Sequence, residues 1–381
     1  MAFPARDEFL IPDDVAYLNV AFLGPMSRAA VAAGEVGLAR KAHPWTIESS
    51  DFFTGAARFR AAVAPLLGGE PEGIAVTPSA SYGLATAAAN LPLAPGQQVV
   101  VLEDQFPSNV YAWQALAAGS AATVVAVDRP ADSDWTSAVL EHLDAVGDRA
   151  AIVALPHCHW TDGTLVDLVA VGARCRALGA ALVVDTAQSL GALPFDVAAV
   201  QPDFLVGVTY KWLLGPYSVG FLWAAPHRRA GAPLEHSWLA RAGSDDFTSL
   251  ASYTDEFEPG ARRYDMGEAS NFALLPAAIA ALEQIAGWGV GEIAAHARSC
   301  TDRVVAGATE LGFTAAGRPF RSGHLVGLRR ADLDAERLAA TLAEEQVHVS
   351  IRGDAVRVSA HVFTTEADVD RLLAALARVH R

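Results

Sequence analysis

The sequence predicts an α/β protein in which a large domain with a mainly parallel sheet is followed by a smaller α+β domain. Between about residues 55 and 223, short β-branched runs alternate with alanine-rich stretches of helical periodicity. After about residue 259, two long helical stretches precede a compact mixture of short helices and strands. With 381 residues, 52% of them hydrophobic, the chain can bury one large core and a smaller one. We expect a large domain over residues 15–258 and a small domain over 259–381 that includes residues 1–14.

Seven short runs in the first region have the composition of buried strands. They cover residues 74–76, 98–102, 123–127, 151–155, 181–184, 204–208 and 219–223. Helical stretches such as 108–118 and 167–178 lie between them. Strands separated by helices favour a mainly parallel sheet of seven strands that is covered on both faces. Ligands of such sheets collect at the carboxyl ends of the strands.

Helix-start patterns support the reading of the C-terminal region. Residues 271–287 and 290–311 have helical periodicity. Asp334 can cap a helix, with Leu333 and Leu338 as a hydrophobic staple, and Thr365 with Asp368 matches a capping box. We therefore expect further helices to begin just after Asp334 and Thr365.

Charge and cysteine content limit the partners and the compartment. The formal net charge is -15, which repels nucleic acid and anionic membrane surfaces. No apolar stretch is long enough to span a bilayer, and the first residues lack the pattern of a secretory signal. Cys158, Cys175 and Cys300 are scattered and odd in number, which argues against a disulfide framework. We expect a cytoplasmic protein that binds neither nucleic acid nor membranes.

A small hydroxyl-rich segment follows the first predicted strand. Residues 77–83 read Thr-Pro-Ser-Ala-Ser-Tyr-Gly and precede the helical stretch 84–90. Free backbone N–H groups and hydroxyls at a helix start, here at Ser79, Ala80 and Ser81, favour an anion such as a phosphate. An ordinary serine cap is the alternative explanation.

Four further residues, each following a predicted strand, indicate one cofactor. Lys211 offers an amine, Asp185 a carboxylate and Gln188 an amide. These groups suit the aldehyde, the pyridinium nitrogen and the phenolic oxygen of pyridoxal phosphate (PLP), and Phe106 is well placed to stack on the ring. Alone, each has an ordinary reading as a surface lysine, a helix cap, an exposed amide or a core aromatic. Their occurrence together, in chain order with the phosphate segment, predicts a PLP enzyme.

The order of these motifs resembles the class V aminotransferase fold family. The segment Tyr-Leu-Asn-Val-Ala at residues 17–21 and the pattern Lys-x-Leu-x-Gly-Pro that begins at Lys211 add to the likeness. This family includes cysteine desulfurases, selenocysteine lyases, isopenicillin N epimerase-like proteins and, more distantly, kynureninases. The resemblance covers nearly the whole chain and implies the type I fold of PLP-dependent transferases.

The resemblance also implies roles for individual residues. Lys211 is expected to hold PLP as a Schiff base and to act on the substrate, Asp185 to pair with the ring nitrogen, and Gln188 to contact the ring oxygen. Phe106 is expected to stack on the ring and Trp160 to line the pocket. The residues expected at the phosphate are Ser79, Ala80, Ser81, Thr209 and Tyr210. On the substrate side, Arg357 is expected to clamp the carboxylate, and Asn19 and His159 are expected to lie nearby. A homodimer with the site near its interface is expected as well, and there Gly267-Glu268 replaces the usual Gly-Thr.

Several positions depart from the desulfurase pattern. Phe106 stands where desulfurases usually carry histidine, and residues 350–354, in the region that resembles their cysteine loop, contain no thiol. His157, Cys158 and His159 are adjacent on an extended strand end, so their side chains point in alternating directions and we expect no metal site.

The expected function is therefore PLP chemistry on an L-amino acid. Lys211 is displaced by the substrate and then removes the Cα proton, and the protonated ring takes up the electrons of the resulting carbanion. A lyase reaction, by β-elimination or other side-chain cleavage, is favoured because it needs no thiol. An aminotransferase is the second alternative, an epimerase the third, and a catalytically silent binding protein the last.

Overall fold

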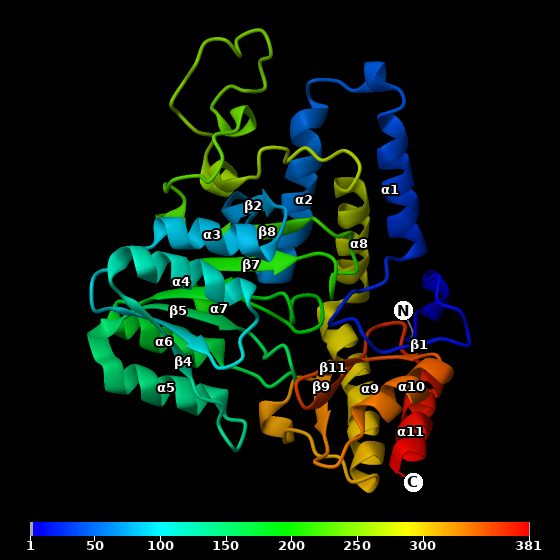
Figure 1. Ribbon diagram of the computed structural model, residues 1–381. Coiled ribbons are helices and arrows are strands. Elements are labelled where there is room, and N and C mark those ends of the chain that lie inside the picture. Colours follow the sequence, from blue (N-terminus) through cyan, green and yellow to red (C-terminus); the bar gives the residue numbers. More distant parts are fainter. Residues whose placement is uncertain (1–2, 381) are drawn as a thin grey trace.

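The computed structural model describes residues 3–380, which form a large sheet-containing unit and a smaller unit beside it (Figure 1). The α-helices are α1 (Arg28–Arg40), α2 (Asp51–Leu67), α3 (Ala80–Asn90), α4 (Ser108–Ser120), α5 (Trp135–Val146), α6 (Leu168–Leu178), α7 (Val197–Val200), α8 (Leu275–Trp288), α9 (Val290–Glu310), α10 (Ala335–Glu344) and α11 (Glu366–His380). The strands are β1 (Ala16–Tyr17), β2 (Ile74–Thr77), β3 (Gln98–Leu102), β4 (Thr123–Val127), β5 (Ala150–Pro156), β6 (Ala181–Asp185), β7 (Phe204–Val208), β8 (Gly220–Ala224), β9 (Leu325–Arg329), β10 (Val347–His348), β11 (Ser350–Arg352) and β12 (Ala355–Ser359).

The large unit is built on a mainly parallel sheet. Within the described residues it has seven strands in the order β2-β8-β7-β6-β5-β3-β4. Strand β8 is antiparallel to both of its neighbours, β2 and β7, while the pairs from β7 to β4 are parallel. Both ends of every strand lie within one residue of the sequence expectation. The predicted mainly parallel, seven-stranded α/β architecture is confirmed.

Both faces of the sheet are buried along its central strands. In β6, Val183 belongs to the core cluster that contains side chains of α3 and α4, whereas Leu182 and Val184 belong to the cluster that contains side chains of α2, α5 and α6. Figure 1 shows these helices on opposite sides of the strands. Successive side chains of a strand point to opposite faces, so a strand buried on both faces needs a continuous apolar run. This requirement explains why the strands are recognisable in the sequence.

Capping residues fix where the helices begin. The hydroxyl of Ser79 accepts the Tyr82 N–H at 3.1 Å, so α3 begins directly after the carboxyl end of β2. The carboxylate of Asp334 accepts the Arg337 N–H at 2.9 Å at the start of α10. The expected capping box is present as well. Thr365 N–H donates to the Asp368 carboxylate at 2.8 Å, and Asp368 N–H donates to the Thr365 hydroxyl at 3.1 Å.

The smaller unit contains an antiparallel sheet in the order β11-β12-β9, packed with α9, α10 and α11. Each unit also includes a segment from the other part of the chain. Strand β1 pairs with β10 of the small unit, and α8 packs on α1 and α2 of the large one. Gly289, at φ +82°, separates α8 from α9. The domain limits at residues 258 and 259 remain a proposal, and the chain on either side of them contributes to both cores.

Among the residues that the structure describes, no helix is long and apolar enough to cross a membrane.

Candidate active site

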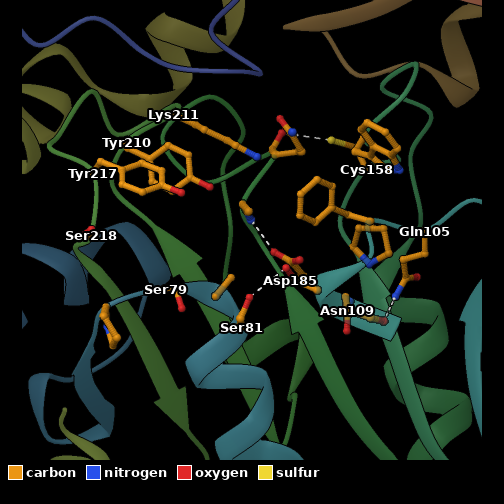
Figure 2. Close-up of a pocket in the computed structure, with 18 residues that line it drawn as sticks. Ser79, Ser81, Gln105, Asn109, Cys158, Asp185, Tyr210, Lys211, Tyr217 and Ser218 are labelled. Atoms are coloured by element: carbon orange, nitrogen blue, oxygen red, sulfur yellow. Dashed lines mark hydrogen bonds between the residues drawn. The ribbon is translucent and has the colours of Figure 1, made fainter. Parts of the chain in front are cut away.

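Two adjoining cavities lie at the carboxyl edge of the large sheet. We call them the inner chamber, of about 420 Å³, and the outer chamber, of about 440 Å³. Segments that follow β2, β3, β5, β6 and β7 line the inner chamber (Figure 2). The outer chamber adds the N-terminal loop and the β11–β12 hairpin. The residues that line both chambers are Phe106, Trp160, Gln188, Tyr210, Lys211 and Tyr217.

Lys211 stands where the two chambers meet. It follows β7 by three residues and is buried, and its Nζ lies 5.4 Å from the centre of the Phe106 ring. Burial lowers the pKa of this amine to about 8, Asp185 opposes the shift, and the cation of Arg357 adds to it. An amine with this pKa is partly neutral near pH 7, and a neutral amine can act as a nucleophile or a base.

The loop that carries Lys211 is held in place by the N-terminal segment. Gly24 N–H donates to the Tyr210 carbonyl oxygen at 2.8 Å. A Cβ at Gly24 would lie 2.1 Å from the Lys211 carbonyl oxygen, so only glycine permits this approach. The contact places Phe22 and Leu23 beside the lysine, where they line the outer chamber.

Asp185 ends β6 and faces the inner chamber (Figure 2). Its Oδ1 accepts the Ala187 N–H at 2.9 Å. Burial raises the pKa of this carboxyl above its ordinary value, although the Ala187 N–H and Lys211 oppose the shift. A cationic ring nitrogen placed against Asp185 would compensate the cost of burying its charge.

The first turn of α3 lies where the sequence predicts an anion site, beside the inner chamber. Ser79, Ala80 and Ser81 line the inner chamber. Helix geometry leaves the first N–H groups of α3 without acceptors inside the helix, and the helix dipole favours negative charge there. The Ser81 hydroxyl lies 2.9 Å from the Ser108 hydroxyl, at the start of α4. Two helix N-termini therefore meet at this end of the chamber.

Aromatic rings form the walls between the chambers. The Phe106 ring is 40% exposed and meets the Trp160 ring edge-on, with centroids 5.5 Å apart. Tyr210 and Tyr217 pack together at 4.6 Å on the side of Lys211 (Figure 2). Burial raises the pKa of Tyr210 to about 12, so its hydroxyl stays protonated at neutral pH and can donate a hydrogen bond.

The amide of Gln188 is oriented by protein contacts on both sides. Its Nε2 donates to the Ala21 carbonyl oxygen at 3.1 Å, and its Oε1 accepts the Trp212 indole N–H at 3.0 Å. An amide nitrogen carries two N–H groups, so one remains for a ligand oxygen. His324 packs edge-on against Trp212 and contacts the Gln188 carbonyl oxygen at 2.6 Å. Sequence reasoning did not single out Trp212 and His324 as supports. Trp212 follows Lys211 in the loop after β7 as an ordinary apolar residue, and His324 directly precedes β9 of the small unit.

Arg357 reaches the outer chamber from β12. Its Nη1 donates to the Trp160 carbonyl oxygen at 2.9 Å, and its Nε is buried without a partner in residues 3–380. Burial and the nearby Arg352 lower its pKa to about 10, so the group remains a cation at neutral pH. A guanidinium with unused N–H groups that faces a cavity can clamp a carboxylate.

Three predicted site residues do not line either chamber. The Thr209 hydroxyl donates to the backbone oxygens of Pro216 and Val219, which fixes the turn before Lys211 instead of contacting a phosphate. His159 is buried against the Trp135 ring. The side-chain oxygen of Asn19 accepts the Ser350 hydroxyl at 2.8 Å, tying the N-terminal loop to the β11–β12 hairpin.

The run from His157 to His159 turns its three side chains toward different neighbours. His157 packs edge-on against Phe195, and Cys158 Sγ lies 3.1 Å from the Gln188 carbonyl oxygen as a donor. Burial raises the pKa of the Cys158 thiol well above its usual range. This cysteine lines the inner chamber as a buried, protonated thiol.

Other lining residues were not predicted. Asn109 in α4 accepts the Trp113 indole N–H at 2.9 Å, while its buried Nδ2 has no partner in the described chain. The segment Phe106-Pro107-Ser108-Asn109 follows a strand and starts a helix, as the segment at Ser79 does, and this parallel was the available signal. Tyr217 and Ser218 lie just after Gly-Pro in the lysine loop, and no pattern in the sequence distinguishes them.

The chambers fit PLP in three respects. A helix N-terminus with free N–H groups suits the phosphate, a buried carboxylate suits the ring nitrogen, and a buried amine of lowered pKa suits the aldehyde. A protein with this fold and these groups is a type I PLP enzyme in architecture.

Comparison with known proteins identifies the family. The aminotransferase class V family model matches residues 40–372, and the chain belongs to this family. It is 28% identical to an uncharacterized aminotransferase, YcbU, of Bacillus subtilis over 80% of this chain and 79% of that protein. It is 26% identical to the isopenicillin N epimerase of Streptomyces clavuligerus over 98% of this chain and 96% of the epimerase.

A solved structure has the same fold. The cystine C–S lyase C-DES, in complex with its product cysteine persulfide, superposes with a TM-score of 0.85 at 21% identity and covers 96% of this chain and 98% of the lyase chain. A variant of that lyase was solved with glycine covalently linked to its PLP. The family match establishes that this protein is a PLP-dependent enzyme of aminotransferase class V, and the solved structure supports the fold.

Proposed function

We propose that this enzyme cleaves a side-chain bond of an L-amino acid by β-elimination, without a thiol of its own. The observation that carries the proposal is the composition of the outer chamber. Next to Lys211 it offers two arginines and an apolar wall of Phe22, Leu23 and Tyr217, and none of its lining residues is a cysteine. Such a chamber holds a carboxylate at one end and lets the cleaved fragment leave beside aliphatic and aromatic side chains.

The inner chamber is proposed to hold PLP. Ser79, Ala80 and Ser81 would bind the phosphate, Asp185 the ring nitrogen, Gln188 the ring oxygen, and Phe106 would cover one ring face. Tyr210 and Asn109 line the same chamber and supply N–H or O–H donors. PLP supplies a group that takes up the electron pair released at the substrate Cα.

Arg357 and Lys211 are proposed to act on the substrate. Arg357 would bind the α-carboxylate through its unused N–H groups and so orient the Cα–H bond toward the lysine. Lys211 Nζ would accept the Cα proton, which its lowered pKa permits near neutral pH. Tyr210 stays protonated, since its pKa is about 12, and it is not a competing base.

The residues that line the outer chamber also bear on the two alternative reactions, epimerisation and aminotransfer. An epimerase that uses two acid–base groups needs one on each side of the Cα. Lys211, with its pKa lowered to about 8, lines the outer chamber, and no histidine, carboxylate or thiol is among the residues that line it. Aminotransfer needs only one base, so it is the second candidate function, and the likeness to an uncharacterized aminotransferase favours it. The match to a C–S lyase supports the fold and is compatible with elimination.

A substrate panel separates these reactions. Purified enzyme is incubated with L-amino acids that carry leaving groups at Cβ, and ammonia and keto acid are measured with and without an added 2-oxo acid. Elimination predicts equal release of both products without the acceptor. Keto acid that appears only with the acceptor, with no ammonia and with the acceptor converted to its amino acid, would establish aminotransfer. Loss of optical activity without either product would establish epimerisation.

The role of thiols is tested separately. Cys158→Ala removes the one cysteine that lines the inner chamber and leaves the outer chamber unchanged. We expect turnover on the true substrate to persist and sulfur, where the substrate contains it, to leave as a small molecule. A substrate-derived persulfide on Cys158, together with loss of turnover in the folded variant, would restore a desulfurase mechanism.

A further inference from the structure

The outer chamber contains a second arginine that the proposed mechanism does not use. Arg352, at the end of β11, lines the chamber together with Arg357. Its Nη1 donates to the carbonyl oxygen of its neighbour Ile351 at 2.9 Å. Within residues 3–380 no carboxylate forms an ion pair with it. The carboxylate nearest in sequence, Asp354, pairs with Arg329 at 2.9 Å instead.

The hairpin register places the two arginines on one face. Arg352 lies opposite Ala355, and Arg357 lies opposite Ser350. Arg357 is therefore two residues along β12 from the partner of Arg352, which makes the two arginines diagonal neighbours. Diagonal neighbours in an antiparallel pair are roughly 7–8 Å apart, close enough to share a chamber and far enough apart to bind separate anions.

The charges around the chamber are unbalanced. Lys211, Arg352 and Arg357 all face it, in a chain whose net charge is -15. Arg352 contributes to the lowered pKa of both Lys211 and Arg357, because like charges disfavour one another. A substrate α-carboxylate on Arg357 leaves one guanidinium without a counter-charge. One further negative charge would balance it, whereas a dianion such as a phosphate would leave an excess.

We propose that the substrate carries a second carboxylate at the end of its side chain and that Arg352 binds it. The substrate class is then L-amino acids with an acidic side chain, whose middle section contacts Phe22, Leu23 and Tyr217. This inference deepens the proposed function, since it rests on the assignment of the α-carboxylate to Arg357. It does not depend on which bond is broken afterwards.

Binding of acid and amide pairs to the PLP-loaded enzyme tests the proposal. L-aspartate and L-asparagine, L-glutamate and L-glutamine, and L-2-aminoadipate and its amide are each titrated while the cofactor absorbance is followed. Each pair has nearly the same shape and differs by one charge. For at least one pair we expect the acid to bind about 10- to 100-fold more tightly, the range for a charge-assisted contact.

Three variants assign this preference to Arg352. Arg352→Gln should make the acid and its amide bind about equally, and Arg352→Lys should keep part of the preference because it keeps the charge but loses the planar fork. Arg337→Gln removes the same charge from an exposed position on α10 outside both chambers and should leave the preference intact. Arg352→Glu should favour basic side chains such as that of L-ornithine.

Three results would overturn the proposal. One is equal binding of acid and amide by the wild type in every pair. Another is a loss of affinity in Arg352→Gln that is the same for both members of a pair, which would mean that Arg352 helps to bind the α-carboxylate. The third is tighter binding of L-cysteate or L-phosphoserine than of any carboxylate. A failure of the lyase assignment would appear separately, in the ammonia and keto acid assay, with these binding ratios unchanged.

Discussion

The inner and outer chambers share a wall but differ in how their polar groups are held. In the inner chamber, Asp185 accepts a backbone N–H and Gln188 is fixed at both ends of its amide. In the outer chamber, Arg357 keeps a buried Nε without a partner in the described residues, and Arg352 donates a hydrogen bond to the carbonyl oxygen of the adjacent Ile351. Asp185 and Gln188 of the inner chamber are therefore oriented by protein contacts before a ligand binds, whereas the two guanidinium groups of the outer chamber have fewer such contacts.

This difference separates chemistry from selection of the substrate. Changes in the inner chamber should alter the cofactor and the rate of bond cleavage, whereas changes in the outer chamber should alter affinity while the cofactor spectrum stays normal. Lys211 belongs to both chambers, so it should affect both properties.

Lys211→Ala should lower kcat/KM by about 10²- to 10⁴-fold, the range for a positioned acid–base group. The variant should still bind PLP without a covalent bond, because the helix N-terminus at Ser79 and the carboxylate of Asp185 remain. Steady-state kinetics and the absorbance of the purified variant measure both effects. A variant that keeps most of its turnover would mean that another group removes the Cα proton.

Asp185→Asn should slow exchange of the substrate Cα hydrogen with solvent by about 10- to 100-fold, because an amide cannot stabilise a positive ring nitrogen. Deuterium exchange followed by NMR measures this rate without requiring product formation. We expect cofactor to remain bound. Unchanged exchange in a folded, loaded variant would show that Asp185 does not face the ring nitrogen.

The same substitution has a pH-dependent effect on the cofactor-free protein. Burial raises the folded-state pKa of Asp185, so its contribution to stability is present at low pH and is lost as pH rises through that pKa. At neutral pH the buried carboxylate therefore lowers the free energy of unfolding, and Asn removes this cost. The Tm of cofactor-free Asp185→Asn at pH 7 should be no lower than that of the wild type, and a clear drop would contradict this account.

Arg357→Lys should raise the KM by about tenfold and change kcat less, because lysine keeps the charge but loses the bidentate fork. The cofactor spectrum should match that of the wild type. Arg337→Gln serves as the control for removal of a distant cation. If saturation by a good substrate is unaffected by Arg357→Lys, the α-carboxylate binds elsewhere, and Arg352 is the first residue to examine.

The pH dependence of cofactor uptake should report the pKa of the Lys211 amine. Only the neutral amine attacks the PLP aldehyde, so the rate of reconstitution should rise with pH and level off above about pH 8, where Lys211 titrates. A lysine at its ordinary pKa of 10.5 would give a rate that still rises beyond pH 9. Stopped-flow absorbance on the cofactor-free protein distinguishes these two profiles.

The two chambers also differ in how far the sequence predicts them. Most strands of the large sheet are continuous apolar runs, so the residue at which each strand ends can be predicted from the sequence. Ser79, Asp185, Gln188 and Lys211 lie at or just after such strand ends and could therefore be predicted as site residues. All four line the inner chamber. The sequence identifies the edge of the sheet because local composition determines where each strand ends.

Side-chain direction and long-range packing are harder to predict from the sequence. Thr209 adjoins the lysine loop, yet its hydroxyl turns back to the backbone of that loop, and no local pattern indicates this. Phe22 and Leu23 reach the outer chamber because Gly24 packs on the lysine loop, nearly two hundred residues later in the chain. Arg352 faces the chamber through the register of a hairpin that the strand pattern alone does not specify.

We propose that Lys211 holds PLP where the two chambers meet. Reduction of the PLP-loaded enzyme with borohydride, followed by proteolysis and mass spectrometry, tests it most directly because the chain has one other lysine, Lys41. We predict that the reduced cofactor is found on the peptide that contains Lys211 and is absent from that peptide in Lys211→Ala. Recovery of the label on the Lys41 peptide of the wild type would contradict the claim.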